Sequence, residues 1–408
     1  MSLTYVVDLG LLDADSDRPA PYACRVTPRV YLDHAATTQM VSAAVEALTA
    51  ELQSPGNASS LHASGRRARR VVEESRERMA AALDCRPGEI VFTSGGTEAD
   101  NLAIKGLAWA RDGQVVTSAI EHHAVLDPVD WLAEHDGTPV RFLDVDDLGR
   151  VDPKEVDRAL AGTPTAVVSL MWANNEVGTL QPIQQVVASA HAHDVPVHTD
   201  AVQAIGAVPV SFAASGVDAM SVSGHKVGGP VGVGALVARR ELALQPLLHG
   251  GGQEREVRSG TLDVAGVAAL AVAVDLAVAD QHQHASHLAG LRDRLEAGIL
   301  ALLPDTLVNG DQANRLPGIA HLSFPGCEGD ALLMLLDAQG VECSTGSACS
   351  AGVPQPSHVL IAMGRDDATA RASLRFSVGR TNTEADIDRV LAVLPDCVAR
   401  AQEAGRRR

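Results

Sequence analysis

Short apolar runs alternate with helix-like segments through the middle of the chain. Strands are predicted at 89–93, 114–118, 166–170, 196–199, 219–222 and 231–237, with a helix over 101–111 after the first of them. Continuous apolar runs of this length, separated by helical segments, are typical of a mostly parallel sheet that is covered on both faces. The pattern therefore predicts an α/β domain in this part of the chain.

The pattern changes on either side of this region. Before it, residues 1–29 predict an irregular arm, followed by a strand at 30–33, a helix at 41–52 and a long amphipathic helix ending near Leu83. After residue 280 the pattern predicts helices at 281–303, 330–338 and 384–399, and strands at 319–324, 341–343 and 373–377. We expect a large domain over 37–280 and a small α+β domain over 281–408, with segment 1–36 packed on the small one.

Composition narrows the classes of partner. The 408 residues carry a formal net charge of −18, which argues against nucleic acid or an anionic membrane. The longest apolar run, 264–274, is too short to span a bilayer, and the chain does not start with a basic segment followed by an apolar one. The six cysteines form no CxxC pair, so we expect free thiols and a cytoplasmic protein.

One stretch stands out, Val222 to Pro230, because it contains Lys226. Only three of the 33 basic residues are lysines, at 105, 154 and 226. An uncharged lysine amine can form a Schiff base, whereas arginine keeps its charge. Lys226 lies between an apolar run and a glycine-rich turn, which suggests a lysine that binds a cofactor. The alternative is an ordinary solvated loop lysine.

Two further motifs follow predicted strands. The turn containing Gly96 and Thr97 lies between a strand and a helix, where backbone N–H groups bind a single phosphate, although an ordinary turn capped by Thr97 is the alternative. Asp200 ends a strand, where open α/β sheets bind ligands. Its carboxylate suits a protonated pyridine nitrogen, and a helix-capping aspartate is the alternative.

His122 and Cys349 suggest a stacking base and a reactive thiol. His122 and His123 follow a strand, and an imidazole there can stack on a flat cofactor or move protons. A zinc site lacks further ligands at suitable spacing, so no metal is expected, and a polar surface pair remains an alternative. Cys349 lies among small, hydroxyl-bearing and glycine residues that leave a thiol accessible, and a harmless surface thiol is the alternative.

A glycine-rich loop at 249–261 carries two arginines and ends at Thr261, so it is a candidate phosphate ligand, either within the subunit or across a subunit boundary. Arg375, on the strand at 373–377, is a candidate clamp for a carboxylate. Singly these signals are weak. Together they make up the parts that pyridoxal phosphate needs to act on an amino acid whose chemistry involves sulfur.

From 30 to 399 the chain resembles the cysteine desulfurase family of class-V aminotransferases. The resemblance rests on the motifs at 31–38, 92–98, 174–178, 200–203, 223–226 and 258–261, and the thiol segment 344–349 resembles the long-loop NifS/IscS type. It implies fold type I of pyridoxal-phosphate enzymes: a mostly parallel seven-stranded sheet in a large α/β domain, with a smaller α+β domain. It also implies a homodimer.

The resemblance also implies roles for individual residues. Lys226 would carry pyridoxal 5'-phosphate as a Schiff base, Asp200 would pair with the pyridine nitrogen, and His122 would stack on the ring and move protons. Phosphate ligands would be Gly96, Thr97, Ser223 and His225, with Thr261 from the second subunit. Ligands of the phenolic oxygen would be Asn175 and Gln203. Candidates for the substrate carboxylate are Arg375 and Asn57, although Ala58 stands where the family commonly has proline.

The implied reaction removes sulfur from L-cysteine, giving L-alanine and a persulfide on Cys349. The sulfur would pass to an acceptor protein, either an iron–sulfur scaffold or a thiolation enzyme. A selenocysteine lyase or another carbon–sulfur lyase on the same fold is the enzymatic alternative. A sulfur carrier without a cofactor is a different class, against which the set of Lys226, Asp200 and His122 argues, and a zinc-binding protein is a third.

Overall fold

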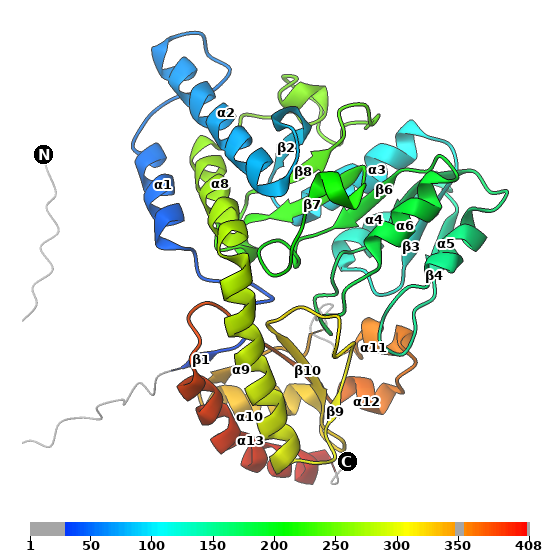
Figure 1. Ribbon diagram of the computed structural model, residues 1–408, viewed down its shortest axis with the longest axis vertical. Coiled ribbons are helices and arrows are strands. Elements are labelled where there is room, and N and C mark those ends of the chain that lie inside the picture. The colour runs from blue at the N-terminus through cyan, green and yellow to red at the C-terminus, as the bar shows by residue number, and fades with distance from the viewer. Residues whose placement is uncertain (1–28, 347–354, 406–408) are drawn as a thin grey trace, which may run out of the picture.

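The computed structural model describes residues 29–346 and 355–405. Its largest element is a seven-stranded sheet with the order β2-β8-β7-β6-β5-β3-β4 (Figure 1). Six strands run parallel, and β8 is antiparallel to both of its neighbours. The bounds are β2 Ile90–Thr93, β3 Gln114–Ser118, β4 Val140–Leu143, β5 Thr165–Ser169, β6 Val197–Asp200, β7 Ala219–Ser223 and β8 Gly234–Ala238. The mostly parallel seven-stranded sheet is confirmed.

Helices cover both faces of this sheet, which explains why its strands are apolar in unbroken runs. Val115 and Val167 pack against α3 and α4, whereas the next residues, Val116 and Val168, pack in the core on the opposite face. We call this part, from α1 to α8, the main-sheet region. Its helices are α1 Ser42–Leu52, α2 Ala63–Leu83, α3 Gly96–Ala110, α4 His123–Trp131, α5 Pro153–Leu160, α6 Ile183–His191, α7 Phe212–Ser215 and α8 Val264–Ala279.

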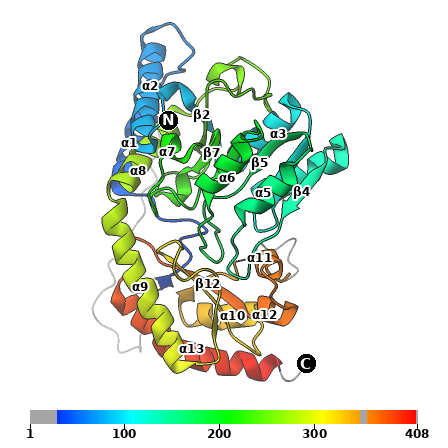
Figure 2. The same ribbon diagram turned by 45° about the vertical axis from the view of Figure 1, so that its right-hand side comes forward.

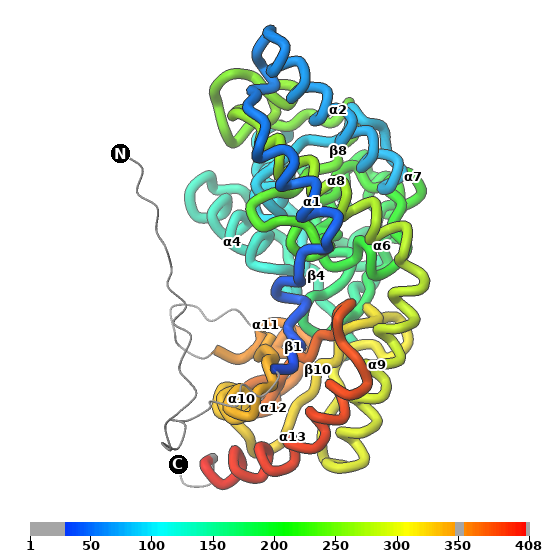
Figure 3. The backbone as a smooth tube through the Cα atoms, turned by 90° about the vertical axis from the view of Figure 1, so that its left-hand side faces the viewer, coloured from blue at the N-terminus to red at the C-terminus, as the bar shows by residue number. Residues whose placement is uncertain are grey.

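A second core forms around smaller sheets, and we call this part, β1 together with β9 to β12 and α9 to α13, the small-sheet region. Strand β1 (Val30–Tyr31) pairs in parallel with β11 (Val341–Glu342), so the N-terminal segment lies here before it crosses to α1 (Figure 3). The antiparallel order β12-β10-β9 joins Ser373–Ser377, Ile319–Ser323 and Leu307–Val308. The helices are α9 Gln281–Leu302, α10 Gly329–Ala338, α11 His358–Ala362, α12 Asp367–Arg371 and α13 Glu384–Gly405.

The two regions are stacked, and α8 and α9 run along one side of both (Figures 1 and 2). Helix α9 follows α8 after a bend of 72°. Short helical turns complete the chain: η1 Pro87–Glu89, η2 Leu132–Asp136, η3 Gly224–Lys226 and η4 Glu254–Glu256. Among the described residues, no single helix is long and apolar enough to cross a membrane, and only the bent pair α8 and α9 passes that test jointly, by length and composition.

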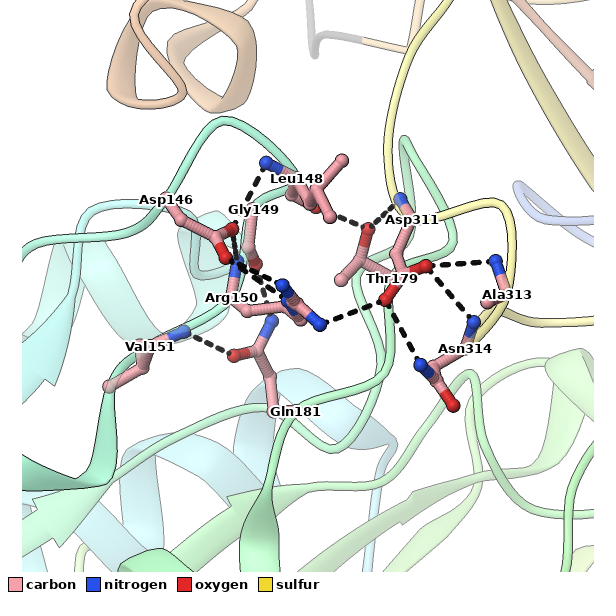
Figure 4. Close-up of polar contacts among 10 residues, drawn as sticks. All are labelled: Asp146, Leu148, Gly149, Arg150, Val151, Thr179, Gln181, Asp311, Ala313 and Asn314. Carbon is pink, nitrogen blue, oxygen red and sulfur yellow. Dashed lines mark hydrogen bonds and ion pairs between the residues drawn. The ribbon is translucent and has the colours of Figure 1, made fainter.

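A polar clamp joins the regions beside the turn that follows β5 (Figure 4). The buried Thr179 hydroxyl donates to the Leu148 carbonyl at 2.7 Å and accepts from the Asp311 amide at 3.0 Å. The Asp311 carboxylate accepts from the amide of Ala313 and contacts the Arg150 guanidinium. Thr179 ends the turn that contains Asn175, so the clamp holds this turn at the carboxyl edge of the sheet.

The predicted elements are confirmed with small shifts. The predicted strands 114–118 and 373–377 have the bounds of β3 and β12. The helix predicted from residue 101 begins at Gly96, because the glycine pair looks like a turn in sequence but Gly96 already has helical geometry. The strand predicted from residue 231 begins at Gly234, because Gly232 turns the chain with a φ of +81°.

Candidate active site

A cavity of about 420 Å³ opens at the carboxyl ends of the main-sheet strands and is faced by β12 of the small-sheet region. Ligands of open α/β sheets bind at this edge. Ten of the predicted site residues line it: Gly96, Thr97, His122, Asn175, Asp200, Gln203, Ser223, His225, Lys226 and Arg375. They come from six separate parts of the chain, and the fold brings them together.

Lys226 ends the helical turn after β7, so its amine reaches the cavity from the strand edge. The amine donates hydrogen bonds to the Ala35 carbonyl at 2.5 Å and the Ala36 carbonyl at 2.8 Å. Burial lowers the pKa of Lys226 to about 8, and the Arg375 charge acts in the same direction. The side chain is thus held in one position and loses its proton more readily than an ordinary lysine, which favours Schiff-base formation.

Asp200 is the last residue of β6 and is almost fully buried. One carboxylate oxygen accepts from the Val202 amide at 2.8 Å. Burial raises the pKa of Asp200 to about 6, while the Val202 hydrogen bond and the Lys226 charge act to lower it. A cationic ring nitrogen placed against this carboxylate would remove the burial penalty, because opposite charges favour the ionised form.

His122 caps the start of α4, and this role determines which of its ring nitrogens carries the proton. Its Nδ1 accepts from the Ala124 amide at 3.0 Å. Burial lowers the pKa of His122 to about 4, with a further contribution from the Lys226 charge. The imidazole is therefore neutral at pH 7, with its proton on Nε2, the nitrogen that remains free to face a ligand.

Arg375 joins the two regions at the cavity. Its guanidinium donates to the Asn175 carbonyl at 2.9 Å and to the Asp33 carboxylate at 2.8 Å, while its buried Nε has no partner. Its backbone pairs with Ser344 through two hydrogen bonds of 2.7 and 3.1 Å. Ser344 and Gly346 both line the cavity, so the segment that leads to residue 349 enters the site beside Arg375.

Comparison with known proteins assigns the family. Residues 30–390 match the class-V aminotransferase family model. An IscS-like cysteine desulfurase of Mycobacterium tuberculosis is 56% identical over 382 residues, which are 92% of this chain and 97% of that protein. The chain belongs to the cysteine desulfurases of the class-V aminotransferase family. Its cofactor is accordingly pyridoxal 5'-phosphate.

Solved structures of similar proteins agree with this assignment. A NifS-like protein superposes with a TM-score of 0.85 at 36% identity, covering 91% of this chain and 99% of that one. A protein solved as SspA in complex with cysteine has a TM-score of 0.76 at 34% identity, covering 86% of this chain and 99% of that one.

The cavity of this desulfurase fits the cofactor. Helix α3 begins at Gly96, and Gly96 and Thr97 line the cavity, so the first N–H groups of the helix, which have no partner within it, are available there for a phosphate. A Cβ atom at Gly96 would come within 2.9 Å of the Val202 side chain, so only glycine leaves this approach open. Asp200 and Lys226 line the same cavity, which supplies a carboxylate for the ring nitrogen and an amine for the aldehyde.

Three predicted residues of the desulfurase are not among the described residues that line the cavity. Asn57 and Thr261 are exposed and outside the cavity lining. The Asn57 side chain accepts from the Ser59 amide. Cys349 lies outside the described residues. Within 29–346 and 355–405, no group of three or more His, Cys, Asp or Glu side chains could hold a metal ion.

Four titratable lining residues of the desulfurase were not among the predicted ligands: Asp100, His123, Glu176 and His358. Asp100 lies four residues after Gly96, which is one helical turn along the same face of α3 and could have been found by that spacing. Glu176 is buried and accepts from the Ser357 hydroxyl. The His358 ring contacts the Glu121 carbonyl through Nε2 at 2.9 Å, and no local pattern indicates this contact.

Proposed function

We propose that this cysteine desulfurase removes sulfur from L-cysteine, leaves it as a persulfide on Cys349 and releases L-alanine. The observation that carries the proposal is the cavity in which Lys226, Asp200 and His122 converge, with the approach to Cys349 entering beside Arg375. The sulfur would then pass to an acceptor protein, an iron–sulfur scaffold or a thiolation enzyme.

The cofactor would be held at four points of the cavity. Backbone groups at Gly96 and Thr97, with the side chains of Ser223 and His225, would bind the phosphate. Asp200 would pair with the pyridine nitrogen, and Asn175 and Gln203 would contact the phenolic oxygen. Lys226 would bind the aldehyde carbon. When bound, pyridoxal phosphate withdraws electrons from the α-carbon of the substrate.

Proton movement would belong to Lys226 and His122. Once the substrate amine has displaced it, the Lys226 amine would remove the proton from the α-carbon as a general base. Its pKa of about 8 supports this role, because a larger fraction of the amine is uncharged near neutral pH than at the ordinary lysine pKa. Neutral His122, with its proton on Nε2, would orient the ring and exchange a proton with the substrate thiol.

Sulfur transfer would belong to Cys349. The thiolate would attack the substrate sulfur, forming an S–S bond and breaking the C–S bond, and the electrons left on carbon would take up protons to give alanine. Cys349 is the third residue after Gly346, which lines the cavity, and three residues of chain reach at most about 11 Å. The Arg375 guanidinium would bind the substrate carboxylate, assisted by Asn57.

The quaternary structure and the location follow as part of the proposal. Exposed Thr261 and Asn57 could complete a site only across a subunit boundary, and a homodimer would provide one. Leu61 and Val231, which are 87% and 79% exposed, support a covered face. The four described cysteines are free thiols, which supports a cytoplasmic location. We also propose the division into domains at 37–280 and 281–408.

A cysteine-to-serine pair tests the proposal. Cys349→Ser should keep the visible absorbance of the bound cofactor but release no sulfide from cysteine with a reducing acceptor. The matched control is Cys343→Ser, because burial raises the pKa of Cys343 and keeps it a thiol. Normal sulfide release from Cys349→Ser would overturn the assigned role. Preference for selenocysteine over cysteine in the wild-type enzyme would identify a selenocysteine lyase instead.

A further inference from the structure

Behind Asp200 lies a layer of polar side chains between the sheet and α3. Paired strand positions place Ser169 beside His198 and Ser221 beside Asp200. Side chains two residues apart on a strand share a face, so all four point to the same side of the sheet. It is the α3 side, because Val197 and Val222 belong to the core on the other face. Asp100 of α3 lies over this layer.

Asp100 is buried without a cation. It is 1% exposed, and its Oδ1 accepts no hydrogen bond. The basic group it contacts is His198, whose Nε2 lies 3.5 Å away. The Ser169 and Ser221 hydroxyls contact the two ring nitrogens of His198 at 2.9 Å each, and burial lowers the pKa of His198 to about 3. His198 is therefore neutral and cannot balance a charge on Asp100.

Three buried carboxyls influence one another here: Asp100 and Asp200 of this layer, and Glu121, which follows β3. Burial raises the pKa of Asp100 well above its ordinary value, and the Asp200 charge raises it further, while the Ser221 hydroxyl acts weakly against them. Burial raises the pKa of Glu121 to about 8. Of the three, Asp200 ionises most easily, because its carboxylate accepts a hydrogen bond from the Val202 amide and is stabilised by the charge of the Lys226 ammonium. The Asp200 charge raises the pKa of both other carboxyls, so the three do not ionise together.

We propose that Asp100 is a protonated carboxyl that positions Asp200 and keeps the negative charge of the pair on Asp200. This deepens the proposed function and rests on the assignment of Asp200 to the pyridine nitrogen. Asp100 is a positioning residue that acts through Asp200. Both line the cavity, so a neutral Asp100 lets Asp200 face the cofactor nitrogen as the single carboxylate of the pair.

The protonation state can be measured on the cofactor-free protein. The infrared difference spectrum of wild type minus Asp100→Asn at pH 7 should contain the carbonyl stretch of a protonated carboxylic acid. Loss of a carboxylate band instead would overturn the proposal. This readout involves no turnover, so it stays valid even if the wild-type enzyme proves not to act on cysteine.

The effect on Asp200 can be measured through cofactor affinity. Asp100→Ala removes the neutral donor and should raise the cofactor dissociation constant about tenfold. Asp100→Asn keeps a donor of the same shape, so it should bind the cofactor at least about fivefold more tightly than the alanine variant. Equal weakening in both variants would show that an ionised Asp100 is needed, and wild-type affinity in Asp100→Ala would show that Asp100 does not act through Asp200. Either result contradicts the proposal.

Discussion

The two walls of the cavity are built in different ways. On the main-sheet wall, the reactive side chains are tied to the backbone: Asp200 to the Val202 amide, and Lys226 to two carbonyls. On the small-sheet wall, Ser344 pairs with Arg375, and the chain then reaches Gly346, whose φ of +83° is a left-handed geometry that glycine adopts without strain.

This contrast matches the two halves of the proposed reaction, proton transfer at a bound substrate and transfer of sulfur to another protein. Proton transfer at a bound substrate needs groups held to a fraction of an ångström, and strand ends and helix starts supply that. A sulfur that passes to another protein needs a carrier that can leave the cavity. The main-sheet wall therefore fits the first half of the proposed reaction, and the second half would take place on the side of the cavity that Ser344 and Gly346 line.

Among substitutions on the main-sheet wall, Lys226→Ala should have the largest effect on activity. Without the amine, the cofactor loses its covalent attachment, and no base remains to remove the proton from the α-carbon of the substrate. Turnover should therefore fall by about a thousandfold or more. Borohydride reduction followed by peptide mass spectrometry should find no cofactor on the variant. Lys154→Ala is the matched control, because it removes another of the three lysines without touching the cavity. A normal reducible attachment in the Lys226 variant would contradict the account.

The junction of the two walls is tested by Arg375→Lys. Lysine keeps the charge but loses the planar fork that spans Asp33 and the Asn175 carbonyl, so KM for cysteine should rise roughly tenfold to a hundredfold, with a smaller change in kcat. Steady-state kinetics measures both values. Arg294→Lys, on the surface of α9, should leave them unchanged. An unaltered KM in the Arg375 variant would remove this residue from substrate binding.

The burial of Lys226 predicts a pH dependence. Only the uncharged amine attacks the cofactor aldehyde, and the lowered pKa of about 8 makes this form available below the ordinary lysine range. The rate of cofactor incorporation into cofactor-free enzyme should rise about tenfold per pH unit below pH 8 and level off above it. Stopped-flow absorbance measures this rate. A rate that keeps rising to pH 10 would show that the amine is not perturbed.

The smallest expected effect concerns the polar clamp that joins the main-sheet and small-sheet regions. Thr179→Val would leave the Leu148 carbonyl and the Asp311 amide without partners, which should lower the free energy of unfolding by about 1–3 kcal/mol. Thr49→Val is the control, because its hydroxyl also donates to a carbonyl but is exposed. Thermal unfolding compares the two variants. Equal midpoints would mean that the clamp contributes little.

The sequence revealed more of the main sheet than of its edges. Apolar strands such as 114–118 are recognisable because both of their faces are buried. Strand β4 was missed, since it lies at the sheet edge and its Arg141 and Phe142 are exposed. The two-residue strand β9 is too short to form a pattern.

The candidate site shows the same limit. Lys226 and Asp200 were predicted because they follow apolar strands. Asp100 and Glu121 were not, because aspartate and glutamate are rarely buried. The spacing from Gly96 places Asp100 on the cavity face of α3, but no local pattern shows that either carboxyl is buried. The packing of α3 on the sheet buries Asp100, and this packing is a property of the whole fold.

The most direct test of the central claim is the fate of the sulfur. Wild-type enzyme is incubated anaerobically with L-cysteine and digested under alkylating conditions, and its peptides are examined by mass spectrometry. One extra sulfur atom should be found on Cys349, with L-alanine formed in equal amount, while Cys343 remains unmodified. Alanine formed with no added sulfur on Cys349, or added sulfur on another cysteine, would contradict the proposed reaction.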